Sequence, residues 1–299
     1  MSGPRVKRAL NGVLILDKVR GGSSNAALQQ AKRLYRAAKA GHAGTLDPLA
    51  TGLLPILFGE ATKFSSDLLE ADKSYAAEIR LGVSTATADA EGEVIATRSV
   101  DVTAEQLARA LQNFRGSILQ TPPLYSALKH AGKPLYAYAR AGIDIEREPR
   151  RVTIHALTLE WFEGDRLALS VTCSKGTYIR SIAHDLGEVL GCGAHLAALR
   201  RTAVGRFGLD CAHTLERLAA MPEAERDACL LPVDALLQEL PEVRLPAAQE
   251  ARFLRGQVVH WDGPLRARVR VYGDAGALLG VGEAAADGTI APKRLIASA

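Results

Sequence analysis

The chain has 299 residues, of which 47% are hydrophobic and 23% are charged. This length suits one large or two ordinary domains, and the hydrophobic content is enough for a real core. No apolar stretch reaches the roughly 18 residues that a membrane helix needs, and residues 13–16 are too few for the core of a signal peptide. We therefore expect a cytoplasmic protein without membrane contact.

The net charge of +4 is unevenly distributed along the chain. Residues 1–40 hold nine Lys or Arg, Arg5 among them, and a single acid, Asp17. Such a local excess favours a polyanionic partner, with a solvated basic face as the alternative.

The four cysteines lie far apart and include no C-x-x-C pair; they are Cys173, Cys192, Cys211 and Cys229. This spacing is unlike that of zinc sites or disulfide frameworks. We predict buried or partly buried free thiols and no metal.

The first predicted elements are a strand and a basic helix. Residues 13–16 form an apolar run typical of a buried strand, and Ser23 begins a group of residues suited to capping a helix. The helix that follows has an apolar stripe reaching Ala38 and basic residues elsewhere, with Gly41 as its predicted stop. A basic helix leading directly into the next loop could bring phosphates close to it.

That loop, residues 41–52, carries one aspartate among three glycines and a proline. Glycine permits unusual backbone angles and close approach by a ligand. Pro48 favours an extended backbone at Asp47, so the carboxylate is held on a stiff segment, where chemistry is often placed. A lone Asp-Pro is more typical of an Asx-type turn, but the twelve-residue context favours function.

Strands and helices alternate further along the chain, which ends in a β-rich segment. We predict strands at residues 75–82, 152–159, 167–173, 266–272 and 278–282, helices at 103–114 and 179–190, a loop at 222–226 and a hairpin turn at 287–288. Thr103 and Gln106 form a capping box that opens the first of these helices. Asp89, Glu91 and Glu93 lack the spacing of an EF-hand, so we predict a solvated turn there.

Several motifs follow one another in a fixed order. They are Gly-His-Ala-Gly-Thr-Leu-Asp-Pro-Leu-Ala-Thr-Gly at 41–52, Gly-Glu-Ala-Thr-Lys-Phe at 59–64, Asp-Lys-Ser-Tyr at 72–75, Pro-Pro-Leu-Tyr-Ser-Ala-Leu-Lys at 122–129, Cys-Ser-Lys-Gly-Thr-Tyr-Ile-Arg at 173–180, Gly-Cys-Gly-Ala-His-Leu at 191–196 and Leu-Arg-Arg at 199–201. This series closely resembles the TruB-type family of bacterial tRNA pseudouridine-55 synthases, over residues 10–235. The resemblance implies an α+β pseudouridine synthase fold with a mixed, mostly antiparallel central sheet flanked by helices. It also implies a catalytic domain at 1–241 and a PUA-like RNA-binding β domain at 242–299.

The implied reaction is the isomerisation of uridine 55 to pseudouridine in the TΨC loop of tRNA, without a cofactor. By resemblance, Asp47 is the nucleophile, Arg180 is the cation that orients it, and Tyr75 packs against the base and abstracts a proton. A carboxylate can form and release a covalent bond, which suits this chemistry. Attack at ribose C1′, attack at uracil C6 and a glycal route all remain open.

The resemblance also implies five contacts with the RNA. His42 enters the space that the extruded uridines vacate, Tyr178 and Leu199 line the pocket of the flipped base, and Lys18 and Lys129 are further binding residues. The implied partner is the T-arm of tRNA. No protein partner is implied, and we expect a monomer.

The chain departs from the family pattern at Val19, where proline is usual, and at Ala86, where an acid often stands. A non-catalytic RNA-binding protein is the alternative from another class, but the presence of Asp47, Tyr75 and Arg180 together disfavours it. A glycosidase needs a second carboxylate partner, and none stands in the matched motifs.

Overall fold

The structure is a computed structural model that describes residues 6–261, 263 and 267–297. Its main sheet has the order β1-β3-β12-β4-β11-β10-β7, with β2 beside β3 and β13 beside β12. These strands are β1 (Gly12–Lys18), β2 (Ala40–His42), β3 (Thr51–Phe58), β4 (Lys73–Leu81), β7 (Gly116–Gln120), β10 (Arg150–Glu163), β11 (Arg166–Cys173), β12 (Ala194–Val204) and β13 (Phe207–Gly208). Only β3 and β12 pair in parallel within this sheet. The predicted mixed, mostly antiparallel sheet is therefore confirmed for the described residues.

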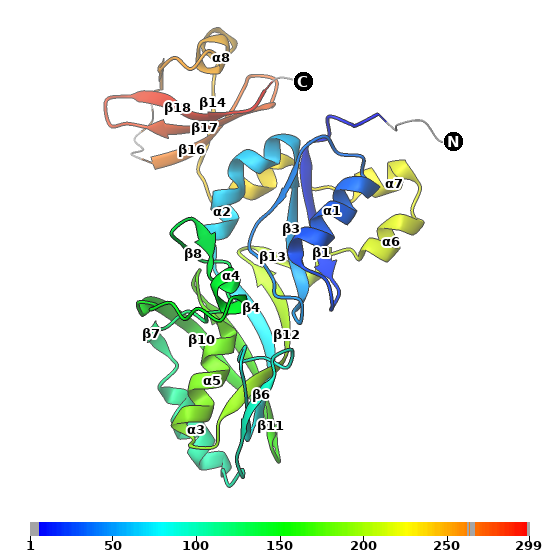
Figure 1. Cartoon of the computed structure of the whole chain (residues 1–299). Coiled ribbons are helices and arrows are strands. Elements are labelled where there is room, and N and C mark those ends of the chain that lie inside the picture. The colour runs from blue at the N-terminus through cyan, green and yellow to red at the C-terminus, as the bar shows by residue number, and fades with distance from the viewer. Residues whose placement is uncertain (1–5, 262, 264–266, 298–299) are drawn as a thin grey trace.

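Helices cover this sheet and close its core. α5 (Ile179–Val189) lies along β12, and α3 (Ala104–Gln112) packs beside it at one end of the molecule (Figure 1). At the other end of the main sheet, α1 (Ser24–Leu34) contacts β3 and α6 (Leu215–Ala220). Fully buried side chains such as Ile79 and Ile182 join the layers, each contributing about 1.5–3 kcal/mol. The shorter helical segments are η1 (Gly59–Phe64), α2 (Ser65–Glu70), η2 (Leu209–Cys211), α7 (Glu223–Ala228) and η3 (Val233–Leu237).

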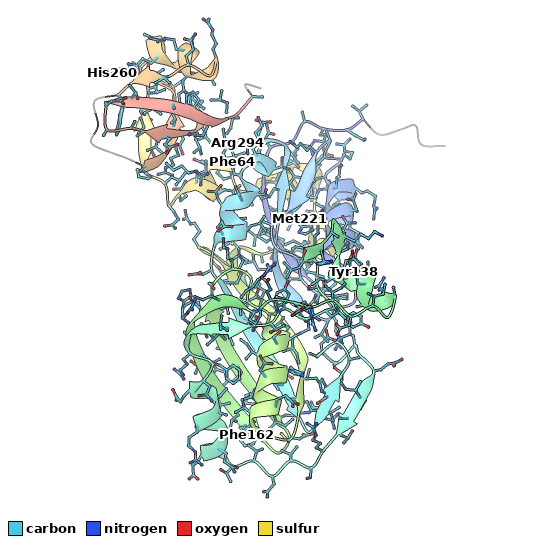
Figure 2. The ribbon with its side chains drawn as sticks, turned by 60° about the vertical axis from the view of Figure 1, so that its left-hand side comes forward. Phe64, Tyr138, Phe162, Met221, His260 and Arg294 are labelled. Atoms are coloured by element: carbon cyan, nitrogen blue, oxygen red, sulfur yellow. The ribbon has the colours of Figure 1, made fainter. Side chains whose placement is uncertain are left out.

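A second sheet with its own core lies at one end of the molecule, beyond α2 (Figure 1). Its order is β14-β16-β17-β18-β15, and it carries α8 (Ala247–Leu254). Its strands are β14 (Glu242–Arg244), β15 (Val259–His260), β16 (Ala267–Tyr272), β17 (Leu278–Ala284) and β18 (Thr289–Leu295). Phe64 packs with Val281 at the junction, where Figure 2 also places Arg294. Lys63 Nζ donates to the Leu295 carbonyl at 2.8 Å, which ties the two sheets together.

Residues 121–149, here called the arm, leave the main sheet between β7 and β10. The arm contains β8 (Lys129–His130), β9 (Lys133–Pro134) and α4 (Leu135–Arg140), and Figure 2 shows Tyr138 on it. The Tyr138 ring meets His130 edge-on at 5.9 Å, and most arm side chains are exposed. A separate hairpin of β5 (Val83–Thr85) and β6 (Val94–Thr97) lies after β4.

Most local predictions are confirmed. The capping box of Thr103 and Gln106 is formed, and strands occupy every predicted stretch, although Arg266 lies outside the described residues, as does Arg5 of the basic N-terminus. All four cysteines are free and at least partly buried. Among the described residues, no helix is long and apolar enough to cross a bilayer.

Two local predictions are wrong. The first helix ends at Leu34 because Arg36 adopts a left-handed φ of 54° and its carbonyl accepts the Arg8 N–H at 2.8 Å. Gly41 lies in β2, so a strand separates the basic helix from the Asp47 loop. Residues 222–226, predicted as a loop, contain the start of α7, which has the Pro222 carbonyl as its first acceptor.

Candidate active site

The loop that carries Asp47 joins β2 to β3 and is fixed by buried polar groups. Lys18 Nζ, at the end of β1, donates to the Ala50 carbonyl at 2.7 Å and lies 3.4 Å from the Asp47 carbonyl oxygen. Ser24 Oγ, at the start of α1, accepts the Leu46 N–H at 2.7 Å. Because the backbone is held on both sides of Asp47, its carboxylate has a defined place.

Two glycines let this loop and the start of β3 lie directly against β12. Gly52 has a φ of 96°, and a Cβ there would stand 2.2 Å from the Arg201 carbonyl oxygen. Gly44 has a φ of 82°, and a Cβ there would stand 3.3 Å from Arg201 Nη1. The close approach expected at the loop glycines therefore involves the protein's own strand and its buried arginine.

Arg180, in the first turn of α5, lies between two carboxylates. Its Nε is 2.9 Å from Asp47 Oδ2 and 3.7 Å from Asp89 Oδ2. Its two terminal nitrogens donate to the carbonyls of Thr87 at 3.1 Å and Tyr125 at 2.7 Å. The Arg180 side chain is 4% exposed and that of Asp47 is 37% exposed, so the cation is fixed inside while the carboxylate still faces open space.

Burial raises the pKa of Asp47 above its usual 3.8; the Arg180 charge opposes this shift and Asp89 adds to it. The ionised form, which a nucleophile needs, is thus maintained by Arg180 against the cost of a partly dehydrated site. Because the pKa is raised, the fraction of ionised Asp47 falls at a higher pH than it does for a free aspartate.

Asp47 and Arg180 open onto a cavity of about 340 Å³. Its volume is in the range of small-ligand sites. Tyr75 from β4, Tyr178 from the start of α5 and Leu199 from β12 line it, so five of the eight predicted site residues meet there. Burial raises the pKa of both tyrosines. The arm closes one side of the cavity with Ser126, Ala127 and Leu128.

The other three predicted residues lie outside the cavity lining. Lys18 is 3% exposed, and its ammonium is directed at carbonyls of the Asp47 loop. His42 is partly buried in β2, and burial, reinforced by the Arg201 charge, lowers its pKa. Lys129 is exposed on the arm. Their contacts with RNA stay predictions.

The predicted solvated turn at residues 89–93 is wrong for Asp89. Its side chain is buried, accepts the Thr87 hydroxyl at 2.6 Å and faces Arg180. The strand-like bridge from Asp89 to Leu196 brings the turn onto β12. A second carboxylate, which the matched motifs lack, is therefore present, but it is buried next to Arg180 and does not line the cavity.

Sequence reasoning also missed two cations in the cavity wall, Arg201 and Lys73, which are 1% and 8% exposed. The available signal was that each cation stands within a partly apolar strand sequence, where a buried cation is rare. Among the described residues, no group of three or more His, Cys, Asp or Glu side chains could hold a metal ion.

Comparison with known proteins gives consistent matches along the chain. Family models described as "TruB family pseudouridylate synthase (N terminal domain)", "tRNA pseudouridylate synthase B C-terminal domain" and "Pseudouridine synthase II TruB, C-terminal" match residues 32–179, 180–238 and 241–296. A protein of Methylobacillus flagellatus named tRNA pseudouridine synthase B is 55% identical, covering 100% of this chain and 99% of its own length. A protein of the same name from Burkholderia mallei strain ATCC 23344 is 57% identical, covering 98% of this chain and 96% of its own length.

A solved structure titled as a Cbf5-Nop10-Gar1 complex has a chain of the same fold, with a TM-score of 0.73 and 26% identity over 96% of this chain and 85% of that one. Fold and site together define the class: a pseudouridine synthase, an isomerase that acts on uridine in RNA. Within that class, the chain belongs to the TruB family, as the sequence motifs indicated.

Proposed function

We propose that the chain converts uridine 55 in the TΨC loop of tRNA to pseudouridine. The relatives that match its full length are named tRNA pseudouridine synthases, which supports tRNA as the substrate. The observation that carries the proposal is the Asp47–Arg180 ion pair at 2.9 Å, opening onto a cavity lined by two tyrosines.

The reaction breaks the bond from C1′ to N1, turns the uracil and joins C1′ to C5. Asp47 supplies the nucleophilic carboxylate, which forms and then releases a covalent bond. Arg180 keeps this carboxylate ionised and, through its bonds to the carbonyls of Thr87 and Tyr125, cannot follow it if it moves. A fixed charge beside a mobile reactant reduces the reorganisation needed in the transition state.

The target nucleotide must leave its stack to reach Asp47. Flipping costs a few kcal/mol and is cheapest in a loop, and stacking on an aromatic ring returns about 1–3 kcal/mol per base. Tyr75 and Tyr178 offer rings in the cavity wall, with Leu199 as an apolar contact. We assign His42 to the space that the base leaves, and Lys129 on the arm to the backbone of the T-arm.

We further propose that the second sheet is a PUA-like RNA-binding domain at residues 242–299, next to a catalytic domain at 1–241. The separate core of this sheet supports this division. We propose that the protein acts as a monomer in the cytoplasm.

An unmodified tRNA transcript tests the proposal. Wild-type protein should convert uridine 55, mapped by mass spectrometry, and Asp47→Asn should bind the transcript without converting it. Asp165→Asn is the matched control, since Asp165 pairs with Arg80 at the exposed turn between β10 and β11. Binding without any pseudouridine from the wild type would favour a non-catalytic RNA-binding protein, and release of free uracil would favour a glycosidase.

A further inference from the structure

Arg201 is the largest fully buried side chain of the described residues. Its Nε donates to the Leu53 carbonyl at 2.7 Å, and its Nη2 donates to the Gly44 carbonyl at 3.0 Å. In the pairing of β12 with β4, Arg201 stands directly opposite Tyr75, so the two side chains share one face of the sheet. The guanidinium and the phenol interact there, at the wall of the cavity.

No acidic side chain among the described residues forms a salt bridge with Arg201. Lys73, on the same strand as Tyr75, is also buried without a salt bridge, since nearby acids only partly offset its burial, and its ammonium donates to the carbonyls of Leu68 at 3.1 Å and Leu69 at 2.7 Å. Burial, with the charge of Arg201, lowers the pKa of Lys73 to about 8. Uncompensated buried cations are costly, and natural proteins tend to keep such violations at functional sites.

We propose that Arg201 is a positioning residue, which orients the Tyr75 phenol toward the bound uracil and balances the negative charge that this phenol carries while it removes the proton on C5. The inference rests on the proposed function, because it requires a uridine in the cavity. It assigns a role to a residue that touches Tyr75 rather than the substrate.

The proton balance explains why a cation is needed there. Once C1′ is joined to C5, the hydrogen on C5 must leave as a proton, and N1, freed from C1′, gains one. If Tyr75 yields its own proton toward N1 and takes the one from C5, the phenol ends as it began. Between the two transfers its oxygen is anionic, in a place where burial favours the neutral form.

The other charged or titratable groups near the phenol do not supply this positive charge. Lys73 uses its ammonium to bond carbonyls of α2. Asp47 is an acid and opposes the anion. Burial raises the pKa of Cys173 on β11 to about 11, so that thiol is neutral at physiological pH. Arg201 stays protonated although burial lowers its pKa, because a guanidinium does not give up its proton in proteins. Arg201 is thus the cation in contact with Tyr75.

Two substitutions separate the charge of Arg201 from its hold on the loop. Arg201→Lys keeps the charge, and Arg201→Gln keeps an N–H donor for the carbonyls but removes the charge. In single-turnover reactions on the tRNA transcript, we expect Arg201→Gln to be slower than wild type by about 10²-fold, with Arg201→Lys losing less. Arg200→Lys is the matched control, because Arg200 lies on the opposite face of β12 and pairs with Asp17.

A transcript with deuterium at C5 of uridine 55 reports on the proton step itself. The C5 isotope effect should rise in Arg201→Gln and should not change in Arg200→Lys. In a Tyr75→Phe background, Arg201→Gln should cause little further loss, because its partner is gone. An unchanged isotope effect, or losses that multiply in the double variant, would overturn the proposal and assign Arg201 to the loop alone.

Separate controls distinguish a variant that does not fold from a failure of the proposed function. If Arg201→Gln melts at a much lower temperature than wild type, the isotope effect is measured in Arg201→Lys instead, which keeps the charge but loses the guanidinium that orients the phenol, and a smaller rise there supports the proposal. Failure of wild-type protein to modify uridine 55 would overturn the proposed function. If wild type is active but substitution of Arg201 does not change the C5 isotope effect, only the present inference is overturned.

Discussion

The floor of the cavity, here the part of its wall that holds Arg180, Arg201 and Lys73, differs from the arm in how its charged side chains are held. On the floor, all three cations are almost completely buried and donate to backbone carbonyls, which for Arg180 and Arg201 belong to segments distant in the sequence. On the arm, Lys129 and Tyr136 are exposed, and contacts are mostly local, such as Arg140 over the Tyr136 ring at 5.6 Å. Both regions border the same cavity.

The difference shows where rigidity is needed. A charge that acts on a transition state must already be in place, so its orientation is fixed by bonds to backbone carbonyls, including that of Tyr125, the arm residue bonded to Arg180. A surface that receives a large, flexible polyanion gains from exposed cations and rings that can adapt. Substitutions on the floor should therefore change the rate of the chemical step, and substitutions on the arm should change RNA affinity.

The largest effect is expected for Arg180→Met. Loss of the guanidinium leaves Asp47 and Asp89 without the cation between them. The pKa of Asp47 therefore rises further, and less of Asp47 is in the ionised form that acts as the nucleophile. We expect the single-turnover rate to fall by about 10³-fold. Rapid-quench measurement at saturating tRNA checks this, with Arg180→Lys as the charge-preserving control. A rate within tenfold of wild type would show that Arg180 is not needed to activate Asp47.

The next effect concerns stability and comes from Lys73. Its folded pKa of about 8 is below the 10.5 of a free lysine, so between these pH values the unfolded chain binds more protons. The free-energy cost of burying the charged Lys73 side chain is therefore complete below pH 8, and it decreases as the pH rises toward 10.5. Relative to Lys73→Met, the unfolding free energy of wild type should therefore increase over this interval by up to about 3 kcal/mol.

Urea unfolding at pH 7.5 and 10.5 measures this change. Lys175→Met is the matched control, since Lys175 is exposed and pairs with Glu70. If the difference in unfolding free energy between wild type and Lys73→Met is the same at both pH values, the prediction is contradicted.

Patterns among neighbouring residues predicted most helices and strands correctly, whereas the errors arose where contacts between distant segments determine the structure. The capping box of Thr103 and Gln106 needs only neighbouring residues, and it is formed as expected. The end of α1 depends instead on a bond between Arg8 and Arg36, which no helix pattern encodes. At the site, the family motifs indicated Asp47 and Arg180, but the burial of Asp89 follows from its turn resting on Leu196, over a hundred residues away.

Asp89→Asn tests that missed residue. Because Asp89 raises the pKa of Asp47, its neutralisation should shift the acid limb of the pH–rate profile to lower pH, the opposite direction from Arg180→Met. The asparagine also holds Arg180 less firmly, so we expect the rate at neutral pH to fall by up to about 10²-fold. Single-turnover rates from pH 4.5 to 8 measure both effects. Glu91→Gln, in the same turn but exposed, serves as the control.

The smallest effect is expected on the arm, from Lys129→Ala. An exposed lysine in contact with one phosphate contributes mainly by counterion release, so the slope of log affinity against log salt should decrease by about 1. The rate of the chemical step at saturating tRNA should stay at the wild-type value, because nothing on the cavity floor is altered. Arg109→Ala is the matched control, since Arg109 is an exposed cation on α3, at the far end of the molecule (Figure 1). Equal salt slopes for wild type and Lys129→Ala would remove Lys129 from the RNA interface, and a slower chemical step at saturation would show that the arm takes part in positioning the base.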